Sequence, residues 1–334
     1  MTNINFIPFW KSFIISFMLF ISVIFICMLY IDPRGVFGTN KFPIVVATTR
    51  GEKMSLLKQM KEKPEILIFG NSHCMRFDPK VVQSFTNLNT FNFAVDSGKI
   101  EDFLSLLQYS INDLYIKPKL IILGISARTF AKIKDEPFDN RLISTNELIK
   151  YLPLNPILKY FFKIKLFFET LNLNYILDAE KSIKLFKENN FLKNYSFDAG
   201  GFFLQEYGRL NEANDFNKKE FSKDSDITGF SDIRIQLFKE FIQTCRQHGI
   251  KLKIIITPYD PSYIRRVDAI DSSYSIFVNK LLKLLRTENT NNYYEIYDYS
   301  RIENYGGINE FIGAGHPSIP NSNLILKKVL KDNQ

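Results

Sequence analysis

The chain is poor in the residues that build metal sites and disulfide frameworks. It holds only 3 cysteines and 3 histidines among 334 residues. Cys27, Cys74 and Cys245 are scattered, and neither a CxxC nor an HxxxH spacing occurs. Such a pattern excludes a cysteine-rich secreted scaffold and disfavours a zinc site. We therefore expect no metal ion and no cofactor.

Internal repeats, low-complexity segments and compact basic blocks are also missing. Glycine (15) and proline (13) are modest, phenylalanine is abundant (32) and 46% of the residues are hydrophobic. Most of the chain should therefore fold around a sizeable core. The formal net charge of +8 is spread over amphipathic stretches such as residues 159–168. With no nucleic-acid motif beside it, this charge predicts lysines that solvate an apolar chain and no nucleic-acid partner.

The longest uncharged run lies at the N-terminus. Residues 12–31 carry no charged side chain and are bounded by Lys11 and by Asp32-Pro33. A helix of about 20 apolar residues can cross a bilayer, and this run meets that length. It ends in Met-Leu-Tyr, whereas a cleaved signal peptide ends in small residues. We expect an uncleaved, single-pass anchor over residues 1–32, with the lipid bilayer as its partner.

The charges beside this run give an indecisive orientation. Lys11 precedes the run, and Arg34, Lys41 and Arg50 follow it. Taken alone, the positive-inside tendency would keep the C-terminal side in the cytoplasm. Long domains cross membranes largely regardless of charge, so the orientation has to follow from the function.

Beyond a connector at residues 33–60, short apolar runs alternate with amphipathic stretches. The expected strands are residues 66–69, 90–95, 120–123, 253–257 and 294–297, and the expected helices are 79–85, 100–111, 231–248, 273–285 and 322–330. Strands alternating with helices are typical of a parallel sheet covered on both faces. We expect a flavodoxin-like, three-layer α/β/α domain over residues 61–334 with a five-stranded parallel sheet.

A long excursion separates the third expected strand from the fourth, at about residues 131–230. Residues 148–189 read as helical and rich in Phe, Leu and Lys, whereas residues 194–228 are polar and contain glycines. An insertion at the active edge of a sheet commonly forms a lid or a substrate-binding subdomain.

Chemically distinctive residues follow four of the expected strands. The four blocks are Gly70-Asn71-Ser72-His73, Asp96-Ser97-Gly98, Gly124-Ile125-Ser126 and Gly313-Ala314-Gly315-His316. Open α/β sheets place their chemistry at the carboxyl ends of the strands, so Ser72 and His316 are expected at one edge. A serine hydroxyl becomes an effective nucleophile when a neighbouring base takes its proton. The pattern predicts Ser72 as nucleophile and His316 as base, with Cys74 a much weaker candidate because nothing lowers its pKa.

In this order, the four blocks resemble those of the SGNH/GDSL hydrolase superfamily, over about residues 64–130 and 250–330. The resemblance implies a nucleophilic role for Ser72, a general-base role for His316 and oxyanion donation by the Gly98 amide. Ser126 stands where the family has an asparagine donor, and its hydroxyl has a shorter reach. Gly313 stands where the family has the aspartate that orients the histidine.

Gly313 has no side chain to fix the histidine tautomer, and disturbing that acid in a serine protease costs about 10⁴ in rate. Either a backbone carbonyl or a carboxylate from elsewhere could take its place. Asp298, Glu303 and Glu310 are the acids nearest in sequence. The residues themselves do not choose among them.

The resemblance implies a serine-dependent esterase or O-acyltransferase that acts on an acylated cell-surface glycan. It implies a location in the cytoplasmic (inner) membrane, an extracytoplasmic catalytic domain and a polytopic membrane acyltransferase as partner. Two other hypotheses stay open: a degenerate site that binds glycan or scaffolds a modification complex, and a purely structural anchored protein. In these, Ser72 and Gly98 are turn residues and Ser126 is a cap.

Overall fold

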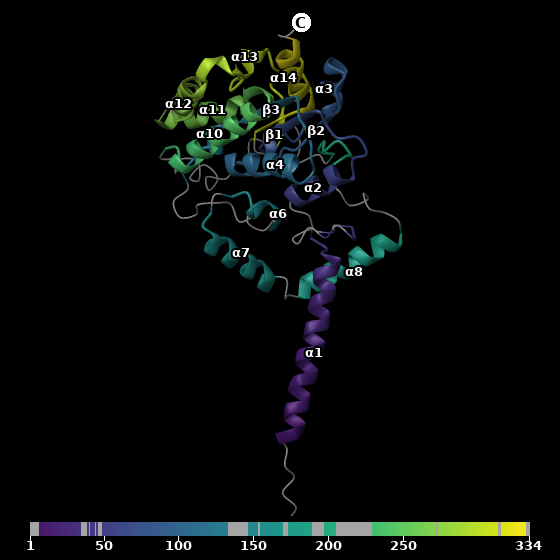
Figure 1. Cartoon of the computed structure of the whole chain (residues 1–334). Coiled ribbons are helices and arrows are strands. Elements are labelled where there is room, and N and C mark those ends of the chain that lie inside the picture. Colours follow the sequence, from purple (N-terminus) through teal and green to yellow (C-terminus); the bar gives the residue numbers. More distant parts are fainter. Residues whose placement is uncertain are drawn as a thin grey trace, which may run out of the picture. The chain divides into compact units, whose positions relative to one another are not determined.

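The computed structural model describes residues 7–34, 39, 41–43, 45, 49–132, 146–152, 154–169, 173–188, 197–204, 229–271, 273–312 and 315–331. The chain divides into two compact units. Figure 1 labels their helices and strands and colours them in sequence order. The smaller unit comprises Met1–Glu52 and Ile143–Tyr195, and the larger comprises Lys53–Leu142 and Ser196–Gln334. The helical first half of the excursion thus belongs to the same unit as the N-terminal run.

The smaller unit is helical in its described residues. It holds α1 (Ile7–Ile31), α6 (Asn146–Ile149), α7 (Pro156–Glu169) and α8 (Leu173–Lys187), while α2 (Thr49–Gln59) crosses the division between the units. Within α1, the 23 residues Phe9–Ile31 are long and apolar enough to cross a membrane, and almost none of this stretch is buried. It is therefore not a core helix. By length and composition it fits a membrane anchor, and a signal sequence passes the same test.

The larger unit is built on a five-stranded parallel sheet. Its strands are β1 (Ile66–Gly70), β2 (Thr90–Asn92), β3 (Leu120–Ile125), β4 (Lys251–Ile256) and β5 (Tyr294–Asp298), in the order β2-β1-β3-β4-β5. Strands β1 to β4 are almost wholly buried, as expected for a sheet covered on both faces, whereas the edge strand β5 is only partly buried. The predicted flavodoxin-like α/β architecture is confirmed.

Helices cover both faces of this sheet. The remaining elements are η1 (Ser72–Cys74), α3 (Pro79–Thr86), α4 (Ile100–Asn112), η2 (Ala127–Thr129), α10 (Asp232–Gln247), α11 (Pro261–Asp271), α12 (Ser273–Glu288), η4 (Thr290–Asn292), α13 (Ile302–Tyr305), β6 (Phe311–Ile312), β7 (His316–Pro317) and α14 (Ile319–Lys331). Right-handed crossovers place α3 on one face and α4 and α10 on the other, because the strand order reverses at β1. Accordingly, α3 packs with α14, and α4 packs with α10 (Figure 1).

Some details differ from the expected elements, and α11 and α13 were not predicted. The second strand is shorter than residues 90–95, although the amides of Phe93 and Val95 still donate to the carbonyls of Ile68 and Gly70. An antiparallel hairpin, β6–β7, precedes α14 and was not predicted, because each of its strands has only two residues. This hairpin carries His316.

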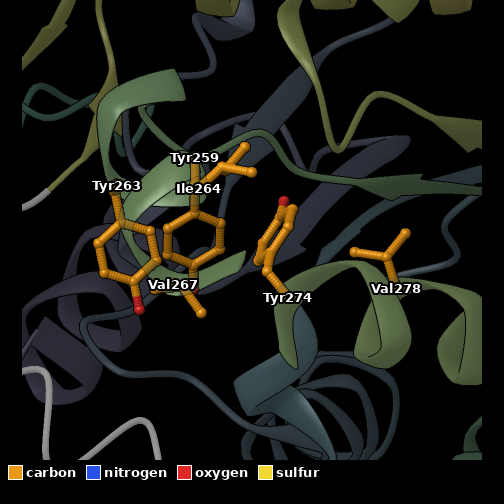
Figure 2. Close-up of a cluster of buried hydrophobic side chains, with 6 residues drawn as sticks. All are labelled: Tyr259, Tyr263, Ile264, Val267, Tyr274 and Val278. Atoms are coloured by element: carbon orange, nitrogen blue, oxygen red, sulfur yellow. The ribbon is translucent and has the colours of Figure 1, made fainter. Parts of the chain in front are cut away.

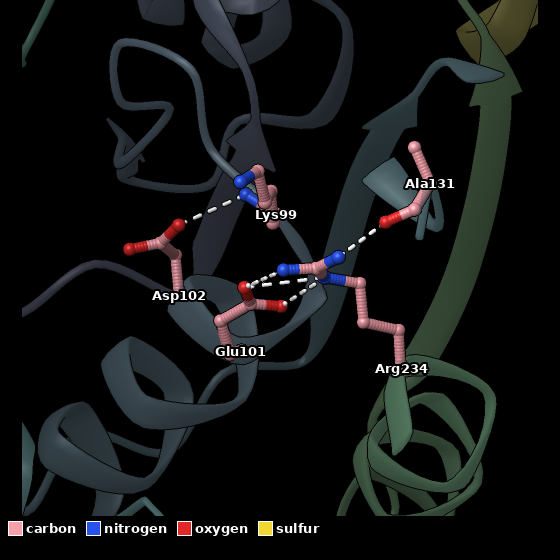
Figure 3. A network of polar contacts seen from close by, with 5 residues as sticks. All are labelled: Lys99, Glu101, Asp102, Ala131 and Arg234. Carbon is pink, nitrogen blue, oxygen red and sulfur yellow. Dashed lines mark hydrogen bonds and ion pairs between the residues drawn. The ribbon is translucent and has the colours of Figure 1, made fainter. Parts of the chain in front are cut away.

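A buried ion pair joins the two helices on one face of the sheet. Arg234 of α10 donates through Nε and Nη2 to the carboxylate of Glu101 in α4, with an Nη2–Oε1 distance of 2.8 Å (Figure 3). Its Nη1 donates to the carbonyl of Ala131, at the start of the excursion. Burial raises the pKa of Glu101, and Arg234 opposes that shift. The arginine therefore holds α4, α10 and the exit from β3 together.

We predict that Arg234→Met destabilises the protein by about 3–5 kcal/mol, because it leaves the Glu101 charge buried without its partner. Adding Glu101→Leu should restore most of that loss, since a buried ion pair and an apolar pair of similar volume are often nearly equal in stability. Urea unfolding measures both effects. The matched control, Lys239→Met in the exposed pair Lys239–Glu288, should cost less than about 1 kcal/mol. Equal losses in Arg234→Met and Lys239→Met would contradict the account.

Candidate active site

Ser72 stands on a short helical turn at the carboxyl end of β1. The strand ends at Gly70, and η1 begins at Ser72. Asn71 caps this turn, since its Oδ1 accepts a hydrogen bond from the His73 amide at 3.0 Å. Its Nδ2 donates to the Ser126 hydroxyl at 2.9 Å, which ties the turn after β1 to the end of β3. Asn71 thereby fixes the backbone on which Ser72 is carried.

Paired glycines make room beneath the turn. Gly70 and Gly124 lie opposite each other where β1 and β3 end. A Cβ on Gly124 would lie only 2.0 Å from Cys74 Sγ, and one on Gly70 would lie 2.6 Å from it. The Cys74 side chain therefore fills the space that both glycines leave open. Burial raises the pKa of this thiol far above its ordinary value, so Cys74 acts as a packing residue and not as a nucleophile.

The β6–β7 hairpin brings His316 to Ser72. The two residues are 244 positions apart in the sequence, yet His316 Nε2 lies 2.8 Å from Ser72 Oγ. Within the hairpin, His316 pairs with Ile312, and the Ile312 backbone accepts a hydrogen bond from the imidazole. Because Nε2 faces the serine, Nδ1 is the ring nitrogen that remains for the Ile312 carbonyl. In that tautomer Nε2 is free to accept the serine proton.

The structure does not bring the three candidate acids to this histidine. The Asp298 carboxylate accepts from the Ser300 amide at 3.1 Å, and the backbone carbonyl of Glu310 accepts from Asn321. Glu303 lies in α13. Within the described part of the chain, none of the three bonds to His316, and Gly313 itself lies outside the described residues. The Ile312 backbone carbonyl acts on the imidazole instead, which favours the first of the two alternatives that the sequence left open.

His316 is held as a neutral base. Burial is the main cause that lowers its pKa to about 4, and the guanidinium groups of Arg76 and Arg128 lower it further. The Ile312 carbonyl and the Asp96 carboxylate act in the opposite direction. Arg76 is buried, Arg128 is exposed, and Asp96 follows β2. The sequence placed Asp96 in one of the four blocks but did not predict that Asp96, Arg76 or Arg128 acts on His316, because charged residues in loops are common.

A second histidine packs against the first. His73 is buried, its Nδ1 lies 2.9 Å from the Pro258 carbonyl, and its ring centroid is 4.9 Å from that of His316. Burial, followed by the proximity of His316, lowers the pKa of His73 well below its ordinary value. The neutral His73 ring, whose Nδ1 donates to Pro258, packs against one face of the His316 ring. His73 therefore points toward the site.

An aromatic cluster supports His73 from behind. The Tyr259 ring lies 4.4 Å from His73, stacks on Tyr263 at 5.3 Å and meets Tyr274 edge-on at 5.7 Å. Figure 2 shows these rings packed with Ile264, Val267 and Val278 of α11 and α12. The Tyr274 hydroxyl donates to the Ser300 carbonyl at 2.9 Å, beside the end of β5. The cluster thus fixes the loop after β4 at the same edge of the sheet as Ser72.

The two predicted oxyanion donors have different positions. The Gly98 amide donates to the Val95 carbonyl at 3.1 Å, so its hydrogen is already used within the turn. A Cβ at Gly98 would lie 2.9 Å from both the Gly70 carbonyl oxygen and the Phe103 ring, which explains the glycine by close packing. Ser126 is buried, and its hydroxyl accepts from Asn71. This leaves the Ser126 hydroxyl proton available for donation.

Comparisons with known proteins give fold neighbours only. No family model and no curated protein matches the chain. The chain is similar to the crystal structure of a candidate acylhydrolase from Bacteroides fragilis, with 11% identity, a TM-score of 0.37 and coverage of 85% of this chain and 95% of that one. A GDSL-like lipase from Bacteroides thetaiotaomicron gives 9% identity, the same TM-score of 0.37, and coverage of 85% and 95%. At such low identity, no residue role is transferred from these structures, and each role has to be argued from the geometry of this chain.

The packing beneath the turn gives a stability prediction. Gly124→Ala should destabilise the protein by about 1–3 kcal/mol, because the new methyl group meets Cys74 Sγ. Adding Cys74→Ala removes the sulfur and should recover most of this loss. Urea unfolding of the single and double variants measures the coupling. Gly229→Ala is the control, since nothing lies within 4 Å of a Cβ there. Strictly additive effects of the two substitutions would contradict the packing account.

The low pKa of His316 gives a titration prediction. In the folded full-length protein, the imidazole should titrate with a midpoint of about 4. The unfolded chain takes up this proton near 6.5, so His316 favours unfolding increasingly as the pH falls from 6.5 towards 4. NMR of histidine-labelled protein measures the midpoint, and a His316→Gln variant assigns the signal. A midpoint of 6.5 or higher would show that the imidazole is neither desolvated nor close to Arg76.

Proposed function

We propose that this protein is a membrane-anchored acyl-ester hydrolase or O-acyltransferase that uses Ser72 as nucleophile and His316 as general base. One observation carries the proposal: Ser72 Oγ lies 2.8 Å from His316 Nε2 at the carboxyl edge of a parallel sheet. Nucleophile and base within hydrogen-bond reach, with the base itself oriented by a third group, form the arrangement needed to activate a serine. Here the third group is the Ile312 carbonyl.

In the first half of the reaction, His316 Nε2 takes the Ser72 proton while Oγ attacks the acyl carbonyl. The resulting tetrahedral intermediate carries a negative oxygen, which needs donors fixed in advance. The Ser72 amide stands at the start of η1, where the first amides of a helical turn have no intrahelical acceptor. The Ser126 hydroxyl is the second donor, because its proton is left free by the bond it accepts from Asn71. The Gly98 amide contributes only if it leaves Val95.

In the second half, the intermediate collapses and the alcohol leaves with the proton held by His316. The acyl group then stays on Ser72 as an ester. Water or a sugar hydroxyl next attacks this ester, again giving its proton to His316, and Ser72 regains its own proton when the acyl product leaves. Water as acceptor makes the protein a hydrolase, and a sugar hydroxyl makes it an acyltransferase.

The missing aspartate sets the expected rate. A backbone carbonyl fixes the tautomer of His316, but it stabilises the imidazolium less than a carboxylate does. Disturbing the orienting acid of a serine protease costs about 10⁴ in rate. Asp96 favours the protonated imidazole electrostatically and offsets part of this loss. We therefore expect slow turnover that still depends on both Ser72 and His316.

The cellular part of the proposal rests on the resemblance and on α1. We place the protein in the cytoplasmic membrane through α1, with the larger unit outside the cytoplasm, an acylated surface glycan as substrate and a polytopic acyltransferase as partner. The second candidate function is a non-catalytic glycan-binding or scaffolding protein. The Gly98 amide already donates to the Val95 carbonyl, so one of the family's oxyanion donors is not free. This favours the alternative.

An acyl-partition assay tests the proposal. Full-length protein in detergent is given p-nitrophenyl acetate, with and without a soluble oligosaccharide, and both nitrophenolate release and sugar acetylation are measured. Removing a general base costs about 10²–10⁴ in rate, so Ser72→Ala and His316→Gln should each lower nitrophenolate release at least about 100-fold. Cys245→Ser is the matched control, since its thiol is buried in α10. Turnover unchanged in Ser72→Ala would support the binding protein.

A further inference from the structure

A large apolar surface is exposed on the smaller unit. In α7, Ile157, Tyr160, Phe161 and Phe168 are between 60% and 65% exposed. Ile157, Phe161 and Phe168 are spaced four and seven residues apart, so they lie on one face of the helix. The first turn of α8 continues this character, with Leu173 70% exposed. Exposed apolar side chains on one helix face mark an interaction site.

Several contacts fix α8 at the C-terminal end of α1. The Arg34 guanidinium pairs with Asp178 at 2.6 Å, just beyond the end of the apolar helix. The Tyr175 hydroxyl donates to Asp32 at 3.3 Å, and the Ser182 hydroxyl donates to the Pro43 carbonyl at 2.6 Å. These polar contacts use the buried face of α8. Its exposed face therefore begins where the membrane-length helix ends.

Charge on these helices complements an anionic surface. Lys165 is exposed at the flank of the apolar face of α7, whereas Lys159, on the opposite side, is half-buried and donates to the Lys150 carbonyl at 2.8 Å. Lys181, Lys184 and Lys187 follow the apolar first turn of α8 and are exposed. Helices with an apolar face and lysines on the polar side lie in the plane of a bilayer, with the apolar face among the upper acyl chains. The long lysine side chains can reach the headgroups while the apolar face stays below them.

We infer that α7 and the first turn of α8 lie in the headgroup region of the membrane that α1 enters and bind anionic lipid through their lysines. The inference rests on the anchor role of α1 in the proposed function, and it is independent of the Ser72 chemistry. The observation that selects the bilayer over a protein partner is the direct attachment of α8 to the end of α1. In this account, the helical half of the excursion is a membrane-binding element, whereas the sequence favoured a lid or a substrate subdomain.

A tryptophan-scanning experiment tests this inference in the full-length protein. The chain has 1 tryptophan, Trp10, at the start of α1. Three forms are reconstituted into vesicles of phosphatidylcholine with phosphatidylglycerol: the wild type, Trp10→Phe with Phe161→Trp, and Trp10→Phe with Lys159→Trp. Lipids with a nitroxide near the headgroup quench tryptophans at that depth, and aqueous iodide quenches those in water. The Lys159→Trp form is the matched control, because it probes the opposite face of the same helix.

The expected result is several-fold stronger lipid quenching for Phe161→Trp than for Lys159→Trp, with the reverse order for iodide. Replacing phosphatidylglycerol by phosphatidylcholine should weaken the quenching of Phe161→Trp and leave that of Trp10 unchanged. Iodide quenching that is equal at both positions would overturn the inference, because both faces would then lie in water. Protection of Phe161→Trp from both quenchers would overturn it too, since protein would cover the face. Absence of lipid quenching at Trp10 would instead show that the anchor itself is wrong.

Discussion

The hydrogen bond between Ser72 and His316 is the contact on which the proposed chemistry of this chain depends. It joins a turn after the first strand to a hairpin before the last helix, at a distance of 2.8 Å. Neither residue reaches that position by local structure alone. The parallel sheet brings the two ends of the larger unit to one edge. The Cys74 side chain packs into the space left by Gly70 and Gly124 and so fixes the turn that carries Ser72. The β6–β7 pairing positions His316.

The environment of His316 replaces an orienting acid with burial and a backbone carbonyl. A carboxylate would raise the histidine pKa and stabilise the imidazolium that forms during the reaction. The carbonyl of Ile312 fixes the tautomer, while desolvation and two arginines keep the imidazole neutral. Such a base is unprotonated at any ordinary pH but is weak. The His73 ring and the tyrosine cluster behind it hold His316 in position. We therefore expect the fixed position of this base to contribute more to the proposed reaction than electrostatic stabilisation of its protonated form.

The sequence predicted the parts of this structure that depend on side-chain pattern. Apolar runs that end at glycine indicated β1 and β3, and the position directly after a strand singled out Ser72. The expected helix over residues 79–85 is observed as α3, which Asp78 caps by accepting from the Lys80 amide at 2.9 Å. These features depend on burial and local hydrogen bonding, and both directly restrict which residue types can occupy a position.

The parts that could not be predicted depend on backbone groups or on distant packing. Any residue at position 312 offers the same carbonyl to His316, so no motif marks it. The same holds for the Gly98 amide, whose bond to Val95 follows from the turn and not from the residue type. Arg76 lies four residues beyond Ser72, but only the fold shows that its charge acts on His316. Similarly, the exposed face of α7 reads as core in sequence, because apolar periodicity is the same for a face that meets protein and one that meets lipid.

The measurement that tests the central claim most directly is covalent labelling of Ser72 by a fluorophosphonate. Full-length protein in detergent is incubated with the probe, and adducts are located by mass spectrometry in the wild type and in His316→Gln. The account predicts an adduct on Ser72 that forms far more slowly in His316→Gln and more slowly as the pH falls through about 4 in the wild type. Wild-type protein that unfolds cooperatively yet carries no adduct, or equal labelling rates in the two forms, would contradict it.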